Sequence, residues 1–383
     1  MRILVLNYEF PPLGWGAANA TYHILREFSK YEDLNITLIT SSIWEYKEEV
    51  FSENIKIYYL DIGKKWQNLH NQNTKDLLRY SQKAYSFAKK LCKNQDIDIV
   101  HAFFGVPCGY IAMKLKDKLN IPYIVSLRGA DVPFYEQKWK NLDKFLFRWL
   151  TPKIWQKASK VIANSKWLKD LALETSPQQK IDIIPNWIDL EKFGISSKNK
   201  DKDIFNILFL SRLTERKWIH YLLDAFYNFA REKEDVKLTL VWDGKLKEYI
   251  QNYVKENKIE EKVDIVWGIS PEYTPYYYSI SDIYILPSSN EWMSNTVLEA
   301  MASGLPVILT DVWWTKELFD RNWWIVEKES SEDIQRKFEE AYDLFRNGKL
   351  QEIWKKSYER AKELSGDNVA KQYLEVYRES AKC

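Results

Sequence analysis

The sequence predicts an α/β protein built from two doubly wound, Rossmann-like parallel-sheet domains, and three observations lead to this fold class. Short apolar runs rich in β-branched residues alternate with longer helical patterns along the whole chain. The runs are apolar throughout, which is typical of parallel strands covered by helices on both faces. The order of strand, loop and amphipathic helix begins twice, at residues 2–28 and at 205–229. A chain of 383 residues is long enough for two separate cores.

The predicted elements follow from these runs in chain order. In the first half, the runs predict strands at 2–7, 36–40, 55–60, 96–103, 122–127, 160–164 and 181–185. In the second half, they predict strands at 206–211, 237–242, 263–267, 282–287 and 306–310, and helical structure from about Ser331 onward. A polar, charged stretch at 191–203 marks the boundary. We therefore expect an N-terminal domain at 1–190, a C-terminal domain at 191–366, and a last helix at 367–383 that packs back on the first domain.

The composition argues against several classes of protein. The 56 Lys and Arg residues nearly balance the 54 Asp and Glu residues, so we expect no nucleic-acid partner. Cys92, Cys108 and Cys383 are widely spaced and predict reduced thiols of a cytoplasmic protein. The apolar run at the N-terminus is too short for a signal peptide, and no run reaches the roughly 18–20 apolar residues of a membrane-spanning helix.

The strand predicted at 282–287 leads into a candidate phosphate site. In open parallel sheets, ligands bind beyond the carboxyl ends of the strands. The next helix is expected to start near Met293 or Ser294, which leaves the amides of Ser294, Asn295 and Thr296 without helical partners. Such a helix start favours an anion, typically a phosphate.

Charged residues surround this helix start in the sequence. Glu291 and Glu299 would accept hydrogen bonds from hydroxyl groups on either side of a phosphate, and a sugar nucleotide has hydroxyl groups in these places. The alternative is that Glu291 is a negative charge that favours the helix dipole and Glu299 is a solvated residue on the helix face. Arg212 and Lys217 lie in the loop after another strand, where two cations suit a diphosphate leaving group; the alternative is a pair of surface cations.

Five short motifs stand in order along the chain: "PP-x-G" from Pro11, "R-G-x-D" from Arg128, "IPN-x-ID-x-x-KF" from Ile184, "SRL-x-x-x-K" from Ser211, and the Glu291 and Glu299 pair followed by "AMASGLPVI-x-T". Together they resemble the motifs of the retaining GT-B glycosyltransferases of the group 1 (GT4) family. The resemblance covers nearly the whole chain and is strongest from 204 to 319. It implies two domains that face each other across a cleft.

The resemblance also implies roles for individual residues. The donor, a nucleotide-diphosphate sugar, would be bound by Gly14, Gly16, Asn186, Arg212, Lys217, Glu291, Met293, Ser294, Asn295, Thr296 and Glu299. The catalytic residues would be Arg128, Asp131, Arg212, Lys217 and Glu291. The acceptor would be a glycan, a lipid-linked or a small molecule, and the leaving phosphate would help to deprotonate it. No Asp-x-Asp cluster follows a strand, so we expect no metal and no cofactor. An epimerase of the same fold and a catalytically impaired sugar-nucleotide-binding protein are the alternatives.

Three features of the first domain leave alternatives open. Many members of the family have His where this chain has Arg128, so Arg128 would steady the leaving phosphate or an acidic acceptor. His101 either lines the acceptor side or is a buried structural histidine, and the structural interpretation is favoured. The stretch 138–160 has seven basic residues against one acid and contains three tryptophans. It is either a helix with a solvated basic face, which is slightly favoured, or a contact with the inner face of a membrane.

Tryptophan occupies positions where the family pattern has glycine. These positions are Trp15, Trp187, Trp218, Trp242, Trp292, Trp313 and Trp314, with Trp267, Trp323 and Trp324 as further candidates. Degeneration would scatter many residue types, and engineering would place indoles in tight turns at a high cost in stability. The favoured hypothesis is that UGA codons that specify glycine were translated as tryptophan. The chain as written is then expected to be a poor enzyme, because the indoles would crowd the diphosphate and sugar pocket.

Overall fold

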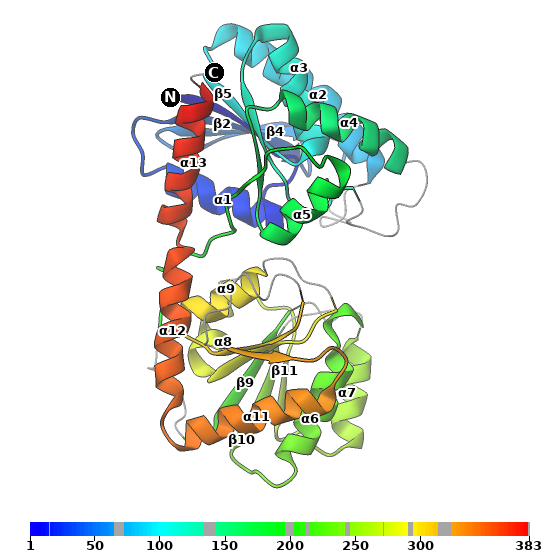
Figure 1. Cartoon of the computed structure of the whole chain (residues 1–383), viewed down its shortest axis with the longest axis vertical. Coiled ribbons are helices and arrows are strands. Elements are labelled where there is room, and N and C mark those ends of the chain that lie inside the picture. Colours follow the sequence, from blue (N-terminus) through cyan, green and yellow to red (C-terminus); the bar gives the residue numbers. More distant parts are fainter. Residues whose placement is uncertain are drawn as a thin grey trace. The chain divides into compact units, whose positions relative to one another are not determined.

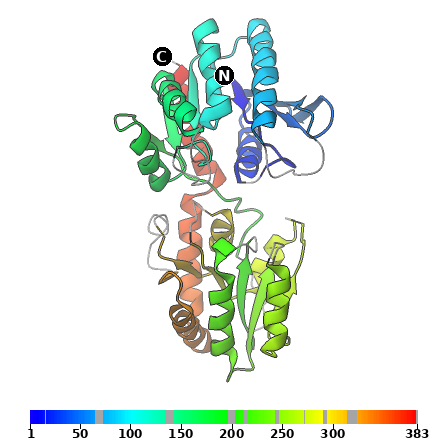
Figure 2. The same ribbon diagram turned by 90° about the vertical axis from the view of Figure 1, so that its right-hand side faces the viewer.

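The computed structural model describes residues 1–14, 16–64, 73–133, 143–195, 203–211, 215–241, 246–270, 272–289, 294–312 and 323–381. The chain divides into two compact units (Figure 1). Unit 1 comprises Met1–Asn186 and Gly366–Cys383, and unit 2 comprises Trp187–Ser365. Each unit is a parallel sheet with helices on both of its faces (Figure 2), which is the fold class predicted from the sequence.

The sheet of unit 1 has the strand order β3-β4-β2-β1-β5-β6-β7-β8. Its strands are β1 (Arg2–Leu6), β2 (Asn35–Ser42), β3 (Lys47–Ser52), β4 (Ile55–Asp61), β5 (Ile99–Phe103), β6 (Tyr123–Ser126), β7 (Lys160–Ala163) and β8 (Asp182–Ile183). All pairs are parallel except β3 with β4. Because β1 pairs with both β2 and β5, the strand order reverses beside it, and this is where open sheets of this kind bind ligands.

The helical segments of unit 1 are α1 (Gly16–Phe28), α2 (Thr74–Asn94), the short segment η1 (Gly105–Gly109), α3 (Tyr110–Leu119), α4 (Asp143–Lys157), α5 (Lys166–Thr175) and α13 (Gly366–Ala381). Side-chain caps fix two of their starts. Asn73 and Asp76 form a capping box at α2, and the Ser165 hydroxyl accepts the Leu168 amide at α5.

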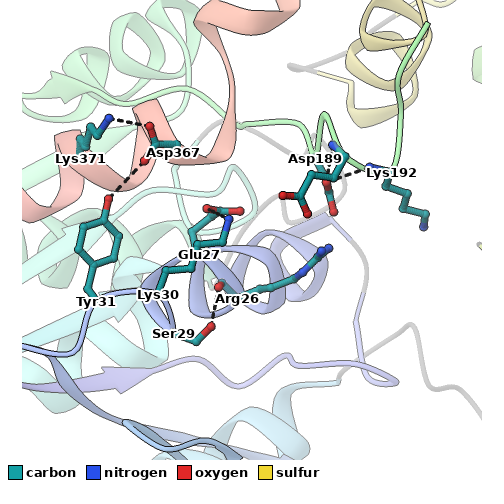
Figure 3. Close-up of polar contacts among 10 residues, drawn as sticks. Arg26, Glu27, Ser29, Lys30, Tyr31, Asp189, Lys192, Asp367 and Lys371 are labelled. Carbon is teal, nitrogen blue, oxygen red and sulfur yellow. Dashed lines mark hydrogen bonds and ion pairs between the residues drawn. The ribbon is translucent and has the colours of Figure 1, made fainter.

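The C-terminal helix α13 packs on α1 within unit 1. Gly366 allows this close approach, because a Cβ atom there would lie 2.9 Å from Cγ of Glu27. Just beyond it, the Tyr31 hydroxyl and the Lys371 ammonium both bind Asp367, at 3.4 and 2.6 Å (Figure 3). The inner side of α13 buries Tyr373 and Tyr377.

The sheet of unit 2 is parallel with the order β11-β10-β9-β12-β13-β14. Its strands are β9 (Phe205–Leu210), β10 (Val236–Val241), β11 (Val263–Val266), β12 (Ile283–Leu286), β13 (Val307–Thr310) and β14 (Trp323–Val326). Its helices are η2 (Glu215–Lys217), α6 (Ile219–Ala230), α7 (Lys247–Glu256), α8 (Thr274–Ile280), α9 (Asn295–Ala302), α11 (Ser331–Arg346) and α12 (Leu350–Glu363). Helix α11 begins at Ser331, as predicted, because the Ser330 hydroxyl accepts the Asp333 amide.

The structure differs from the sequence prediction at the unit boundary and at two strands. The division falls after Asn186 rather than after residue 190, because the Ile188 amide donates to the Leu364 carbonyl and Ile188 pairs with Ser365 inside unit 2. Strands β3 and β14 were not predicted: β3 is a charged edge strand, and β14 begins with two tryptophans. Among the described residues, no helix is long and apolar enough to cross a membrane.

Candidate functional site

In unit 2, the predicted phosphate-binding helix start lies at α9. The helix begins at Asn295 with Ser294 as its N-cap residue, within a residue or two of the prediction. The Ser294 carbonyl accepts the amides of Val297 and Leu298, both at 3.1 Å. The Ser294 hydroxyl does not cap the helix and lies instead 3.0 Å from the Thr296 hydroxyl. Met293 lies outside the described residues.

Glu299, inside α9, has one engaged and one open carboxylate oxygen. The buried Tyr278 hydroxyl donates to Oε2 of Glu299 at 2.9 Å. No group within the described parts of the chain donates to Oε1. Burial raises the pKa of Glu299 to about 7, opposed by the Tyr278 hydrogen bond and by the charge of Lys192. Near pH 7 this carboxylate therefore has a free acceptor oxygen and changes charge easily.

A hydrogen-bonded tyrosine and a pair of aromatic rings hold the residues around Glu299 in place. The Tyr284 hydroxyl lies 2.8 Å from the Thr296 hydroxyl and 3.1 Å from the Leu210 carbonyl, which links α9 to the end of β9. The ring of Phe193 packs edge-on against Tyr278, with 5.8 Å between their centroids. Tyr278 and Tyr284 could not be recognised as functional residues from the sequence, because both lie in apolar patterns that predict core residues.

Lys192 is positioned by a turn within the "IPN-x-ID-x-x-KF" motif. The Asp189 carboxylate accepts the backbone amides of Glu191 at 3.0 Å and of Lys192 at 3.1 Å (Figure 3). The turn places the Lys192 ammonium where its charge lowers the pKa of Glu299. The motif was noticed in the sequence, but Lys192 was not among the predicted site residues.

Lys217 ends η2, in the loop after β9. Its side chain is buried, with 6% of the residue exposed, so it is not an ordinary surface cation. The neighbouring Arg216 carbonyl accepts the Ser289 amide at 2.9 Å and the Ser288 hydroxyl at 3.1 Å. These bonds tie the loop after β9 to the loop after β12. Arg212 and Glu291 were predicted in the same two loops and lie outside the described residues.

In unit 1, Arg128 lies just beyond the end of β6. Its Nη1 donates to Oδ1 of Asn186 at 3.0 Å, its Nη2 donates to the Tyr373 hydroxyl at 3.3 Å, and its guanidinium lies 4.6 Å above the Phe103 ring. No carboxylate of the described residues forms an ion pair with it. A half-buried arginine held by neutral groups keeps its positive charge available for an anionic or polar ligand.

Asp131 is engaged by backbone amides. It is 5% exposed, and its two oxygens accept the amides of Gly105 at 2.6 Å and of Arg128 at 2.9 Å. Burial raises the pKa of Asp131, while these amide bonds and the charge of Arg128 oppose the rise. The carboxylate therefore joins the loop after β5 to the loop after β6.

His101, at β5, is a buried structural histidine, which confirms the favoured interpretation. Its Nδ1 lies 2.7 Å from the Tyr377 hydroxyl and its Nε2 lies 2.7 Å from the Ser126 hydroxyl. Burial and the nearby charge of Arg128 lower the pKa of His101 well below its usual value, so the ring is neutral.

The loop before α1 requires glycine at position 14. Gly14 has φ +87°, and a Cβ atom there would lie 2.5 Å from Oε2 of Glu9. Gly16 is the first residue of α1, and Trp15 between them lies outside the described residues. Glu9 was not predicted as a site residue, although it stands shortly after the end of β1.

Among the tryptophans predicted to stand where the family pattern has glycine, Trp218 shows the conformation that glycine favours. Its backbone has φ +43° and ψ +40°, the left-handed region that bulky side chains rarely adopt. Trp187 and Trp324 have no such positive φ. Trp267 precedes Gly268, which has φ +61°. The side chain of Trp323 is not described, and Trp15, Trp242, Trp292, Trp313 and Trp314 lie outside the described residues.

Comparisons with known proteins agree with this geometry. Residues 16–192 match Glycosyltransferase Family 4, and residues 191–360 match Glycosyl transferases group 1. A Campylobacter jejuni relative is 30% identical over 297 residues, 75% of this chain and 78% of the relative. An uncharacterized glycosyltransferase of Methanocaldococcus jannaschii is 24% identical over 382 residues, 99% of this chain and 98% of the relative.

Solved structures share the fold. The sucrose-phosphate synthase of Thermosynechococcus elongatus has a TM-score of 0.80 at 17% identity and covers 98% of both chains. Anabaena HepE, solved with UDP, has a TM-score of 0.74 at 16% identity over 99% of this chain and 100% of that one. The fold is that of the GT-B glycosyltransferases, as predicted. The chain belongs to the group 1 (GT4) glycosyltransferases, a family of sugar-transferring enzymes.

Proposed function

We propose that this protein is a retaining glycosyltransferase that moves a sugar from a nucleotide-diphosphate donor to a glycan, lipid-linked or small-molecule acceptor. The proposal rests on the hydrogen bonding of the Glu299 carboxylate. A carboxylate fixed by the Tyr278 hydroxyl, with its second oxygen open, suits the hydrogen bond from a ribose hydroxyl of the donor.

The remaining donor contacts follow from the loops of unit 2. Lys217, with Arg212 from the same loop, would neutralise the diphosphate, and the backbone at 294–296 would contact its oxygens at the helix start. Glu291 would hold a hydroxyl of the transferred sugar. In unit 1, Gly14 and Gly16 would let the backbone approach the diphosphate.

The chemistry needs a proton acceptor and stabilisation of the leaving group. The acceptor hydroxyl would attack the anomeric carbon as the bond to the diphosphate breaks, and the leaving phosphate would take the hydroxyl proton. Arg128 would bind the acceptor or steady the leaving phosphate, and Asp131 would position Arg128 through its backbone amide. We propose a reaction without metal or cofactor. The described residues contain no group of three or more His, Cys, Asp or Glu side chains that could hold a metal ion.

Two relatives make a lipid-linked acceptor a reasonable expectation. The Campylobacter jejuni relative is named as an N-acetylgalactosaminyltransferase that acts on a diphospho-undecaprenol. A Streptococcus pneumoniae relative, 26% identical over 249 residues, is an alpha-monoglucosyldiacylglycerol synthase. In this chain, the exposed Trp149 of α4, with the Lys153 ammonium 3.2 Å from its ring centroid, would face the membrane in the 138–160 stretch. We propose a cytoplasmic enzyme that works at the inner face of the membrane.

We also propose that the tryptophans at glycine positions arise from UGA codons that specify glycine in the source. The left-handed backbone of Trp218 supports this proposal, because glycine adopts that conformation without strain. Peptide mass spectrometry of the protein from its native host tests it. Glycine at position 218 is expected, and tryptophan there would refute the proposal.

A donor panel tests the proposed activity. The chain as written and a version with glycine at Trp15, Trp292 and Trp313 are incubated with nucleotide sugars and candidate acceptors, and products are followed by proton NMR. We expect the glycine version to transfer the sugar with its anomeric configuration retained, and the chain as written to transfer it poorly. An epimerised donor, binding without turnover, or inversion would each overturn the proposal.

A further inference from the structure

A buried chain of hydrogen bonds connects Arg128 to the C-terminal helix α13 of the same unit. Of its five members, His101 lies in β5, Ser126 ends β6, Arg128 follows β6, and two tyrosines lie one turn apart on α13. Nη2 of Arg128 lies 3.3 Å from the Tyr373 hydroxyl, and the Tyr373 hydroxyl lies 3.2 Å from the Ser126 hydroxyl. The Ser126 hydroxyl lies 2.7 Å from Nε2 of His101, and Nδ1 of His101 lies 2.7 Å from the Tyr377 hydroxyl. Except for the half-buried Arg128, all members are buried.

The direction of this chain can be worked out from its ends. Two directions are possible, and each leaves one hydroxyl hydrogen without an acceptor, on Tyr373 or on Tyr377. Arg128 can only donate, so the Tyr373 oxygen accepts from it. If the hydroxyl hydrogen without an acceptor were on Tyr373, it would lie beside the positive charge of the guanidinium. On Tyr377 it lies at the other end of the hydrogen-bond chain, away from Arg128. The charge therefore favours hydroxyl dipoles that point away from Arg128.

This direction fixes the state of His101. The Tyr373 hydroxyl donates to Ser126, and the Ser126 hydroxyl donates to Nε2 of His101. The neutral ring must then carry its proton on Nδ1 and donate it to the Tyr377 oxygen. The lowered pKa of His101 is consistent with a neutral ring in this position. Arg128 thus donates to Tyr373, Tyr373 donates to Ser126, and Ser126 donates to His101. In this way the buried histidine stabilises the acceptor on which Arg128 depends.

The chain also determines which donors Arg128 keeps for a ligand. Asn186 takes one N–H of Nη1 at 3.0 Å, and Tyr373 takes one N–H of Nη2. A guanidinium has two N–H groups on each Nη atom, so one on each remains, and the buried Nε–H also has no acceptor among the described residues. The two acceptors and the Phe103 ring hold the guanidinium plane, and an arginine fixed in this way loses less side-chain entropy when it binds a ligand.

We infer that Tyr373 of α13 is a positioning residue for Arg128, acting through a directed hydrogen-bond chain in which His101 is the Nδ1–H tautomer. The inference rests on the proposed function for the role of Arg128 in sugar transfer. It gives the C-terminal helix a part in the reaction beyond completing the fold of unit 1. The substrate itself would contact Arg128 and not Tyr373.

Nitrogen-15 NMR of the ligand-free protein tests the chain without any substrate. The four histidines and the arginines are labelled with nitrogen-15, His101 is assigned with a His101→Gln variant, and Arg128 is assigned with an Arg128→Lys variant. We expect the Nδ1–H tautomer for His101 and separate signals for the two Nη atoms of Arg128, because both are held. In Tyr373→Phe, the Nη signals should merge by rotation, whereas in Tyr377→Phe they should stay separate. An Nε2–H tautomer, or held Nη atoms in Tyr373→Phe, would overturn the inference.

Sugar transfer by the version with glycine restored provides the second readout. Each substitution removes one buried hydroxyl from the same helix, so losses in thermal stability should be similar. Tyr373→Phe should lower kcat/KM for the acceptor about ten-fold, and Tyr377→Phe, which keeps the Tyr373 hydroxyl beside Arg128, should lower it less. Equal effects of the two variants would show a purely structural role. If the unsubstituted enzyme transfers no sugar, the proposed function fails, and the NMR result alone decides whether Tyr373 holds Arg128.

Discussion

The two units place a carboxylate at the same edge of their sheets, but they use it differently. In unit 1, both oxygens of Asp131 accept backbone amides, and the residue is 5% exposed. In unit 2, the described residues engage only Oε2 of Glu299, through the Tyr278 hydroxyl, and Glu299 is half-buried. A carboxylate whose oxygens are both taken by the backbone organises loops, whereas one with an open oxygen can accept a ligand hydroxyl. The hydrogen-bond partners, and not the residue type, separate a structural carboxylate from a binding one.

The cations of the two units show a related contrast. Arg128 is held by the neutral side chains of Asn186 and Tyr373, so its guanidinium has a fixed position and no ion-pair partner among the described residues. Lys217 is buried in a loop whose backbone is tied to the next strand end through Arg216. Unit 1 thus holds Arg128 by contacts to its side chain, whereas unit 2 holds the backbone of the loop that contains Lys217.

The largest effect should come from removing the structural carboxylate. Asp131→Ala leaves the buried amide of Gly105 and the partly buried amide of Arg128 without acceptors, at a cost of about 1–3 kcal/mol each, so we expect the free energy of unfolding to fall by roughly 2–6 kcal/mol. Urea denaturation measures the change. Asp367→Ala is the control, because its hydrogen bond from Tyr31 and its ion pair with Lys371 are both exposed, and such an ion pair is worth about 0–1 kcal/mol. Similar losses in the two variants would remove the contrast between Asp131 and an ordinary surface aspartate.

The titration of Glu299 should appear in the pH dependence of donor affinity. With its pKa raised to about 7, Glu299 is ionised above that pH and protonated below it, and the ionised form is the better acceptor for ribose hydroxyls. Affinity should therefore fall by ~10-fold from pH 8 to pH 6. A nucleotide sugar is used for calorimetry, because its diphosphate diester does not titrate in this range. The dependence should vanish in Glu299→Gln; a flat profile in the unsubstituted protein would contradict the assignment.

A smaller effect is expected for Tyr278→Phe. The Tyr278 hydrogen bond lowers the pKa of Glu299, so its loss should raise that pKa further and move the midpoint of donor affinity to higher pH. At pH 7, affinity should fall by about 3–10-fold, the value of one ordinary hydrogen bond. Tyr284→Phe serves as the control, because its hydroxyl bonds Thr296 and not Glu299. An unshifted midpoint in Tyr278→Phe would show that the bond does not tune the carboxyl group.

Several parts of the fold could be predicted because local patterns determine them. Apolar runs predicted the parallel strands, and the helical pattern from about Ser331 onward predicted the start of α11. Helix α9 began within a residue or two of the expected position. The edge strand β3 was missed because its charged residues carry no apolar run, and it is held by pairing with β4 rather than by burial.

The contacts of the candidate site were harder to predict. Tyr373 is separated from Arg128 by 245 residues, and Tyr278 from Glu299 by 21. A tyrosine in an apolar pattern predicts a core position, but the pattern does not say which group receives its hydroxyl hydrogen bond. The amide partners of Asp131 depend likewise on how two loops meet. These contacts require the folded chain, because hydrogen-bond satisfaction is settled by tertiary packing.

The most direct test of the central claim, that Glu299 binds the ribose of a sugar-nucleotide donor, is a calorimetric cycle. Nucleotide sugars with ribose and with 2′,3′-dideoxyribose are titrated into the glycine-restored protein and into its Glu299→Gln variant. Loss of a charged hydrogen bond of about 1.5–3 kcal/mol predicts that the unsubstituted site prefers ribose by ~10–150-fold. In Glu299→Gln, this preference should largely disappear. An equal preference in both proteins would contradict the account.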